Sequence, residues 1–107
     1  MTRRWSVRYS THFIDDASAR FPVERGEGGA LTFGEFMAGP VRAARLLFEA
    51  DWDGLPPQAG DAVRTVHTFS PHVGPIVFYG VLVGPASVEI AGFDIDEDYW
   101  GSSQLRV

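Results

Sequence analysis

The stretch 76–83 constrains the fold more than any other part of this chain. Its sequence, Ile-Val-Phe-Tyr-Gly-Val-Leu-Val, is apolar at nearly every position, so a strand formed here is apolar on both faces. Segments of β-rich composition precede it at 61–69 and follow it at 88–95. A loop at 70–75 and a tight turn at 84–87 separate the three segments, and both contain proline. Connections this short predict a meander of three antiparallel neighbours, centred on 76–83.

The beginning of the chain predicts one strand and one helix. Residues 4–10 alternate between polar and apolar side chains, with Trp5, Val7 and Tyr9 on one face, which is typical of a half-buried strand. Residues 11–21 then carry apolar side chains at helical spacing. The first strand must join the same sheet as the meander to bury its apolar face.

A longer helix is predicted for 32–50. Thr32 and Glu35 have the spacing of a capping box, in which each side chain binds the backbone of the other residue. Gly39-Pro40 interrupts the segment, but the apolar stripe keeps its phase, which favours one kinked helix over two. The stripe consists of Phe33, Phe36, Met37, Val41, Ala44, Leu47 and Phe48.

These elements predict an α+β fold with a four-stranded, mainly antiparallel sheet and helices packed on one face. We expect residues 1–100 to form a single domain and residues 101–107 to be a polar tail. The apolar residues of 88–95 change phase near Gly92, which predicts a bulge there. Helices on one face would leave the second face of 76–83 uncovered, so we expect residues 99–100, a second copy or a partner to cover part of it.

Composition excludes several classes of function. The chain has 107 residues, a net charge of −5 and no cysteine, so disulfides and thiolate metal sites cannot form. All nine basic residues are arginine, which excludes a lysine nucleophile. The acidic balance disfavours nucleic acid as a partner, and no apolar run is long enough to span a membrane. We expect a cytoplasmic protein without a cofactor.

An acidic segment follows the last predicted strand. Asp94, Asp96 and Asp98 alternate as in the opening of a calcium loop, but the glycine and the distal glutamate of that motif are missing. We interpret the segment as a solvated strand end or as a docking patch for a basic partner. The candidate partner-binding residues are Asp94, Asp96, Glu97, Asp98, Tyr99 and Trp100.

The remaining candidate sites are small. His12, His67 and His72 match no short zinc motif, so we predict no metal site. The candidate catalytic side chains are His67 and Tyr99. Clustered arginines near the N-terminus form a candidate basic patch that consists of Arg3, Arg4 and Arg8.

In order and spacing, the chain resembles the RelE/ParE superfamily of small bacterial toxins. The resemblance covers the first strand, the two helices, the meander over 63–69, 74–79 and 88–93, and the aromatic pair Tyr99-Trp100. It implies a toxin fold that binds an antitoxin segment laid across the domain. Ribonucleases of that family use basic side chains on the central and last strands and often a C-terminal tyrosine. Here residues 76–79 are apolar, residues 94–98 are acidic, and only Tyr99 matches.

The acidic segment would repel both an mRNA and the charge that develops on a cleaved phosphate. The hypothesis is therefore a protein-binding module of toxin–antitoxin type without the basic ribonuclease residues. One alternative is an acidic inhibitor or immunity-type protein that masks a basic partner. Another is a small-molecule-binding protein with a pocket under the helices, near His67 and Tyr79. The partner could also be a second copy, which would make a homodimer.

Overall fold

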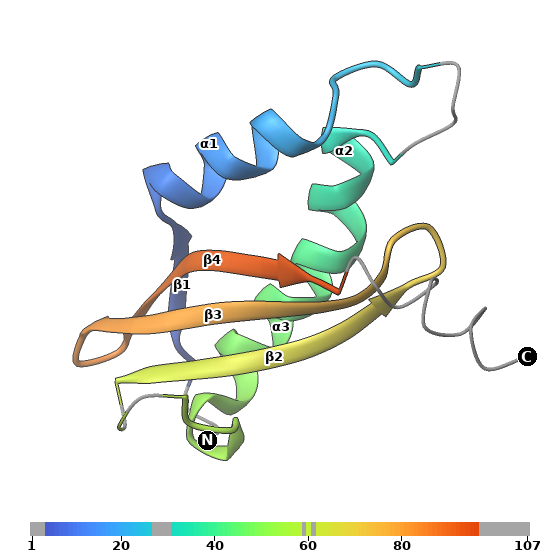
Figure 1. Cartoon of the computed structure of the whole chain (residues 1–107). Coiled ribbons are helices and arrows are strands. Elements are labelled where there is room, and N and C mark those ends of the chain that lie inside the picture. Colours follow the sequence, from blue (N-terminus) through green and yellow to red (C-terminus); the bar gives the residue numbers. More distant parts are fainter. Residues whose placement is uncertain (1–3, 27–30, 59, 61, 97–107) are drawn as a thin grey trace, which may run out of the picture.

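The computed structural model describes residues 4–26, 31–58, 60 and 62–96 (Figure 1). The predicted order of strand, helix, helix and three strands is confirmed, and so is the α+β class. The elements are β1 (Ser6–Tyr9), α1 (Thr11–Arg20), α2 (Phe33–Phe36), the π-helical turn η1 (Met37–Val41), α3 (Arg42–Asp51), the 3₁₀ turn η2 (Trp52–Gly54), β2 (Val63–Ser70), β3 (Gly74–Gly84) and β4 (Ser87–Ile95).

The four strands form one sheet in the order β1-β4-β3-β2. As the meander predicts, β3 is antiparallel to both β2 and β4. The first strand joins the same sheet at its far edge, where β1 runs parallel to β4. The sheet is therefore mixed, with β1 next to β4 and not next to β3.

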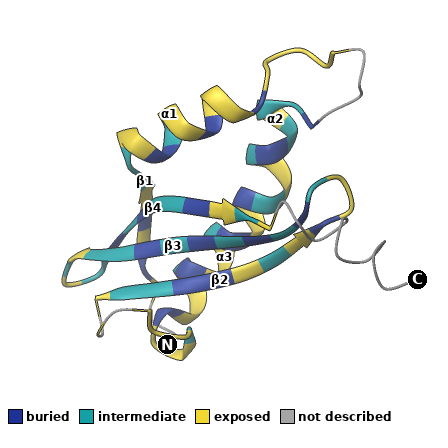
Figure 2. Ribbon diagram, viewed as in Figure 1, coloured by how far each residue is buried: buried dark blue, intermediate teal, exposed yellow. Residues whose placement is uncertain are grey.

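The helices pack on one face of this sheet (Figure 1). Alternate residues of β3 point into the core, so Ile76 and Phe78 are fully buried (Figure 2). Aromatic rings from the helices meet them there: Phe13 lies 6.4 Å from Phe78 between ring centroids, and Phe36 lies 6.0 Å from it. The described helices and strands leave the second face of the sheet uncovered, as expected for a sheet with helices on one side.

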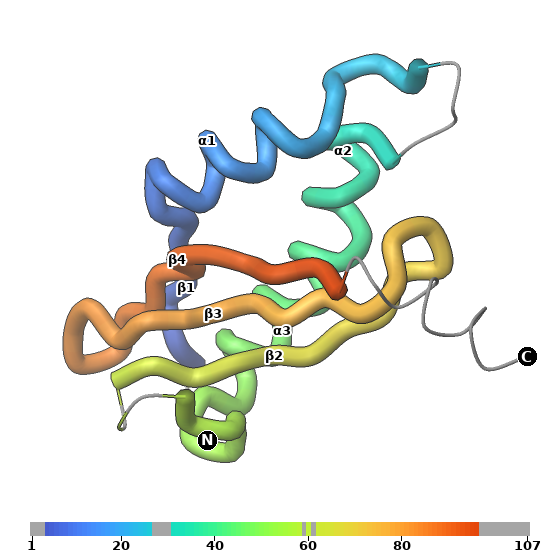
Figure 3. Tube along the Cα trace, viewed as in Figure 1, coloured from blue at the N-terminus to red at the C-terminus, as the bar shows by residue number. Residues whose placement is uncertain are grey.

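The long helix is continuous from α2 through η1 to α3 (Figure 3), which agrees with the single kinked helix. The capping box forms: Thr32 Oγ1 accepts from the Glu35 backbone N–H at 3.2 Å, and Glu35 Oε1 accepts from the Thr32 backbone N–H at 3.1 Å. Pro40 lies inside η1 and has no N–H to donate, so the helix widens to a π-turn here.

Leu47 does not lie in the core, although the apolar stripe predicted that it would. Its side chain is 45% exposed, whereas Ala44 and Phe48 of the same helix are fully buried. The π-turn contains an additional residue, which rotates α3 relative to α2 and moves Leu47 off the stripe that Phe36 begins.

Two local features of the meander complete the sheet. The loop predicted at 70–75 is shorter, because β2 and β3 continue to Ser70 and Gly74 and leave only residues 71–73 in the turn. Gly74 has a φ of 88°, in the left-handed region that favours glycine. The bulge predicted near Gly92 is present: Tyr79 pairs with Gly92 while Gly80 pairs with Ile90. It returns Phe93 to the buried face of the sheet.

Candidate functional site

The face of the sheet that the described helices leave uncovered carries several apolar side chains, and we name it the open face. On the central strand its residues are Val77, Tyr79 and Val81, which are half-buried, and Val83, which is 43% exposed. The alternation of β3 places them there, opposite Ile76 and Phe78. The central strand also contributes Pro75, and the neighbouring strands add Val63, His67 and Phe69 from β2, Glu89, Gly92 and Asp94 from β4, and Arg8 from β1. Thr65 of β2 follows the same alternation but is buried, and its backbone N–H donates to the Pro56 carbonyl.

Valines meet directly across the open face. Val63 pairs with Val81, and Val81 pairs with Glu89 on the other side. Cross-strand pairs of this kind place side chains on the same face about 5 Å apart, so the apolar groups form a band along β3 that Val63 and Phe69 of β2 extend at its two ends.

An acidic end borders this band. The Tyr79 hydroxyl donates to Asp94 Oδ2 at 2.7 Å, and this hydrogen bond raises the pKa of Tyr79 above its ordinary value. Asp94 is exposed, and so is Asp96, whose backbone N–H donates to the Pro75 carbonyl at 3.1 Å. The structure therefore places Asp94 and Asp96 together beside the apolar band. Glu97, Asp98, Tyr99 and Trp100 lie outside the described residues.

The predicted basic patch is divided between several environments. Arg8 Nε donates to Glu89 Oε2 at 2.9 Å, which offsets its charge on the open face. Arg4 is exposed ahead of β1, and Arg3 lies outside the described residues.

The structure describes one of the two candidate catalytic residues. His67 is exposed on the open face, where its Nε2 lies 3.4 Å from the Thr65 hydroxyl, and Tyr99 lies outside the described residues. His12 begins α1 and His72 lies in the turn between β2 and β3. Within the described part of the chain, no group of three or more His, Asp or Glu side chains is arranged to hold a metal ion.

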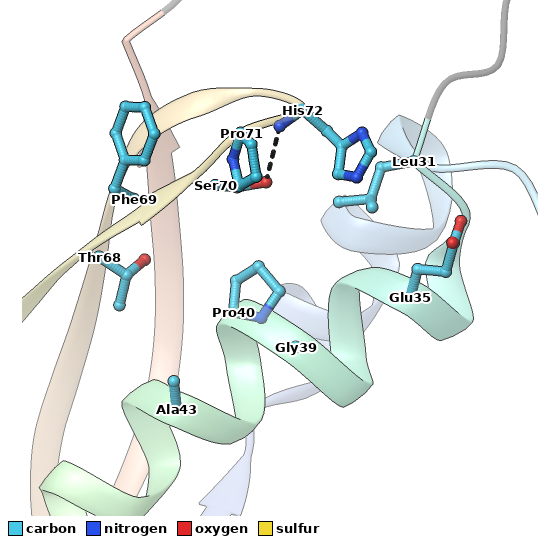
Figure 4. A pocket seen from close by; sticks show the side chains of 10 residues that line it. All are labelled: Leu31, Glu35, Gly39, Pro40, Ala43, Thr68, Phe69, Ser70, Pro71 and His72. Carbon is cyan, nitrogen blue, oxygen red and sulfur yellow. Dashed lines mark hydrogen bonds between the residues drawn. The ribbon is translucent and has the colours of Figure 1, made fainter.

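A pocket of about 440 Å³ lies elsewhere, between η1 and the β2–β3 hairpin. Figure 4 shows Gly39, Pro40 and Ala43 along the helix on one side and Thr68 to His72 along the hairpin on the other. Neither His67 nor Tyr79 lines it, so it is not the pocket predicted for a small molecule. Sequence reasoning missed this pocket, although the prolines at 40 and 71 that shape it were visible.

The charged group of the pocket is already used by the fold. Glu35 accepts from Thr32 within the capping box and forms an ion pair with Arg25. The hydrogen bond from the Thr32 backbone, followed by that from Arg25, lowers the pKa of the Glu35 carboxyl. Because its carboxylate is held by these groups, the pocket offers mainly apolar walls to a ligand.

No family model, curated protein or solved structure matches this chain. The described helices include none that is long and apolar enough to cross a membrane.

Proposed function

We propose that this chain is a protein-binding module of toxin–antitoxin type, similar to RelE/ParE toxins but without their basic ribonuclease residues. Its partner lies across the open face. The observation that carries this proposal is the band of apolar side chains on β2 and β3 that the described helices leave uncovered, which includes Val77, Tyr79, Val81 and Val83.

Burial of this band supplies the binding free energy. Complete burial of a valine contributes roughly 1.5–3 kcal/mol, and a partner recovers the part that the folded domain leaves exposed. Tyr79 adds a ring with a polar tip, a residue type that is enriched in protein interfaces.

The acidic end favours a partner with basic residues. Asp94 and Asp96 lie next to the apolar band, so an apolar segment flanked by arginine or lysine matches both the shape and the charge of the surface. The same two carboxylates support the second candidate function, an acidic inhibitor that masks a basic protein.

The proposal predicts a short open reading frame next to the gene, and the test uses its product as the candidate partner. We expect the chain to arrest growth when it is expressed alone in a bacterial host and to form a complex with that product, which relieves the arrest. Calorimetry should give about 30-fold weaker binding for Val81→Lys, because it places a charge in the apolar band. Leu46→Lys, on the exposed side of α3, is the matched control and should bind normally.

Two results would decide against this proposal. Cleavage of ribosome-bound mRNA by the purified chain would contradict the absence of ribonuclease activity. Equal binding by Val81→Lys and Leu46→Lys would show that the open face is not the docking surface. Binding that is strongly weakened by salt and abolished by Asp94→Asn with Asp96→Asn would favour the acidic inhibitor instead.

A further inference from the structure

Two adjacent leucines of α3 are exposed. Leu46 is 49% exposed and Leu47 is 45% exposed. Ala43 and Ala50 of the same helix are exposed as well. Elsewhere in the described chain, the exposed large apolar side chains are isolated in sequence; they are Val23, Phe69 and Val83. A helix that carries apolar residues on its solvent side as well as its core side is typical of one that packs on both sides.

Leu46, Leu47 and Ala50 lie on the solvent-exposed side of α3, and Ala43 lies at the edge of that side, where it also lines the pocket beside the β2–β3 hairpin. Successive residues of an α-helix are about 100° apart, so Ala43 and Ala50 lie almost on one line and Leu46 and Leu47 lie on either side of it. The buried Ala44 and Phe48 lie on the opposite side, against the sheet. We name Ala43, Leu46, Leu47 and Ala50 the outer face of α3.

The spacing of the outer face is the same when it is read in either direction. Alanine, leucine, leucine and alanine occupy positions 43, 46, 47 and 50, symmetrical about the midpoint between Leu46 and Leu47. An antiparallel copy of α3, related by a two-fold axis, would place Ala43 opposite Ala50 of the second copy. Each leucine would then pack near its own counterpart. Alanines on the central line allow the two helices to approach to about 8 Å, the short end of the usual interaxial range.

Charges along one flank match the same arrangement. Arg42 and Glu49 are seven residues apart and lie on the same side of the outer face. Within the described residues Arg42 has no ion pair, and Glu49 forms one with Arg45 at 2.9 Å through Oε1, with 18% of its side chain exposed. A two-fold axis perpendicular to the helices places the flank that carries Arg42 and Glu49 beside the same flank of the second copy, which runs in the opposite direction. Arg42 therefore comes within reach of Glu49 of the second copy. A parallel two-fold pair would bring opposite flanks together, so Arg42 would not face Glu49 of the second copy.

We propose that α3 packs antiparallel against α3 of a second copy of this chain, across a two-fold axis. The resulting homodimer is isologous, because the same patch serves both subunits. Its interface is on the helical side of the sheet, so the open face stays accessible to another partner. Because α3 is ten residues long, the contact is smaller than a standard interface, and we expect a dissociation constant of about 1–100 μM.

Sedimentation equilibrium of the full chain tests the interface. We expect a monomer–dimer equilibrium whose dissociation constant rises at least about 30-fold in Leu46→Lys and in Leu47→Lys. Both side chains are exposed, so circular dichroism should show that these variants remain folded. Val83→Lys, on the open face, is the matched control and should dimerise as the wild type does.

Cysteine cross-linking tests the direction of the helices. The chain has no cysteine, so Ala43→Cys and Ala50→Cys introduce one thiol each. We expect a mixture of the two variants to form the mixed disulfide between positions 43 and 50 in preference to either homodisulfide. Each variant alone should cross-link poorly, because its two thiols are separated by about 10 Å along the helices.

Three outcomes would overturn the inference. A wild-type chain that stays monomeric at about 1 mM has no such dimer. If Val83→Lys disrupts the dimer and Leu46→Lys does not, the dimer forms through the open face and the proposed α3 pairing is wrong. Homodisulfides at position 43 and at position 50 would indicate parallel helices. A loss of partner binding in Val81→Lys tests the function proposed above and has no bearing on these results.

Discussion

Substitution of Gly80 by alanine should destabilise the domain, because the ring of Phe48 packs directly on the glycine. A Cβ atom built at Gly80 would lie 2.5 Å from Cε1, 2.9 Å from Cζ and 3.0 Å from Cδ1 of Phe48. Phe48 is fully buried, so the ring has no open space to move into. Either the ring or strand β3 must shift to accept the methyl group.

Two opposing terms set the size of the effect. An additional methyl group in a packed core costs about 1–3 kcal/mol. Replacing glycine by alanine at a compatible φ stabilises by about 0.4–1 kcal/mol, because the unfolded chain loses freedom. We therefore expect Gly80→Ala to lower the free energy of unfolding by about 1–2 kcal/mol, which lowers the Tm by about 4–8 °C in a domain of this size.

Urea denaturation followed by tryptophan fluorescence measures this change, since Trp5 and Trp52 are buried and report on folding. Gly92→Ala is the matched control: it lies in the same sheet, and a Cβ there would meet nothing within 4 Å. Phe48→Leu should partly rescue Gly80→Ala, so the double variant should be about 1 kcal/mol more stable than the sum of the single effects predicts.

Equal stability of Gly80→Ala and Gly92→Ala would show that the Phe48 ring does not crowd position 80. Simple additivity of the substitutions at 80 and 48 would show that the cost arises from the backbone of β3 and not from the ring.

Three further substitutions probe the polar contacts of the fold. Arg64→Lys should destabilise the domain by about 1–2 kcal/mol in urea denaturation, because the guanidinium donates to two backbone carbonyls of the segment after α3, at 2.8 and 3.2 Å. The lowered pKa of Glu35 stabilises the fold at pH values above the ordinary carboxyl range, and this contribution is lost as the pH falls. Glu35→Gln should remove the contribution, so the urea midpoints of the wild type and the variant should converge in acid. Asp94→Asn should lower the pKa of Tyr79, measured by phenolate absorbance. The raised pKa of Tyr79 stabilises the fold below the ordinary tyrosine range and this contribution is lost as the pH rises, so the variant should also lose less stability in alkali. An unchanged urea midpoint for Arg64→Lys would contradict the contribution of the Arg64 hydrogen bonds. A constant offset for Glu35→Gln at every pH would contradict the contribution of the lowered pKa of Glu35. An unchanged phenolate titration in Asp94→Asn would contradict the effect of Asp94 on Tyr79.

Local patterns in the sequence predicted the elements well. The alternation around Val7 predicted β1, the spacing of Thr32 and Glu35 predicted the capping box, and the change of phase near Gly92 predicted the bulge. Each of these features depends on side chains within a few positions of one another, so the printed sequence contains all of the information required.

Non-local features were harder to predict. The parallel pairing of β1 with β4 has no local signal, because neither strand contains a residue type that specifies its neighbour. The π-turn at Pro40 depends on how the helix fits the sheet, and its rotation of α3 exposes Leu47. The pocket beside His72 lies between the helix and the hairpin, so no sequence pattern within either element alone predicts it.

The candidate site shows the same division. The apolar second face of 76–83 was evident from composition, and the open face follows from it. The position of Asp94 beside Tyr79 depends on the register across the bulge, and only the assembled sheet shows it.

The placement of β1 beside β4 has a consequence for how the chain becomes a domain during synthesis. Arg8 and its partner Glu89 are 81 positions apart, so closing that loop costs about 4 kcal/mol of chain entropy plus a constant. Among the described strands, a ribosome makes β1 first, and its neighbour β4 follows β2 and β3. The strand β1 must therefore wait, with Trp5 and Val7 unprotected, until β4 has been made. A nascent chain stalled before residue 87 would contain every described helix but would lack the strand that pairs with β1. A separate peptide with the sequence of β4 could pair with β1 instead.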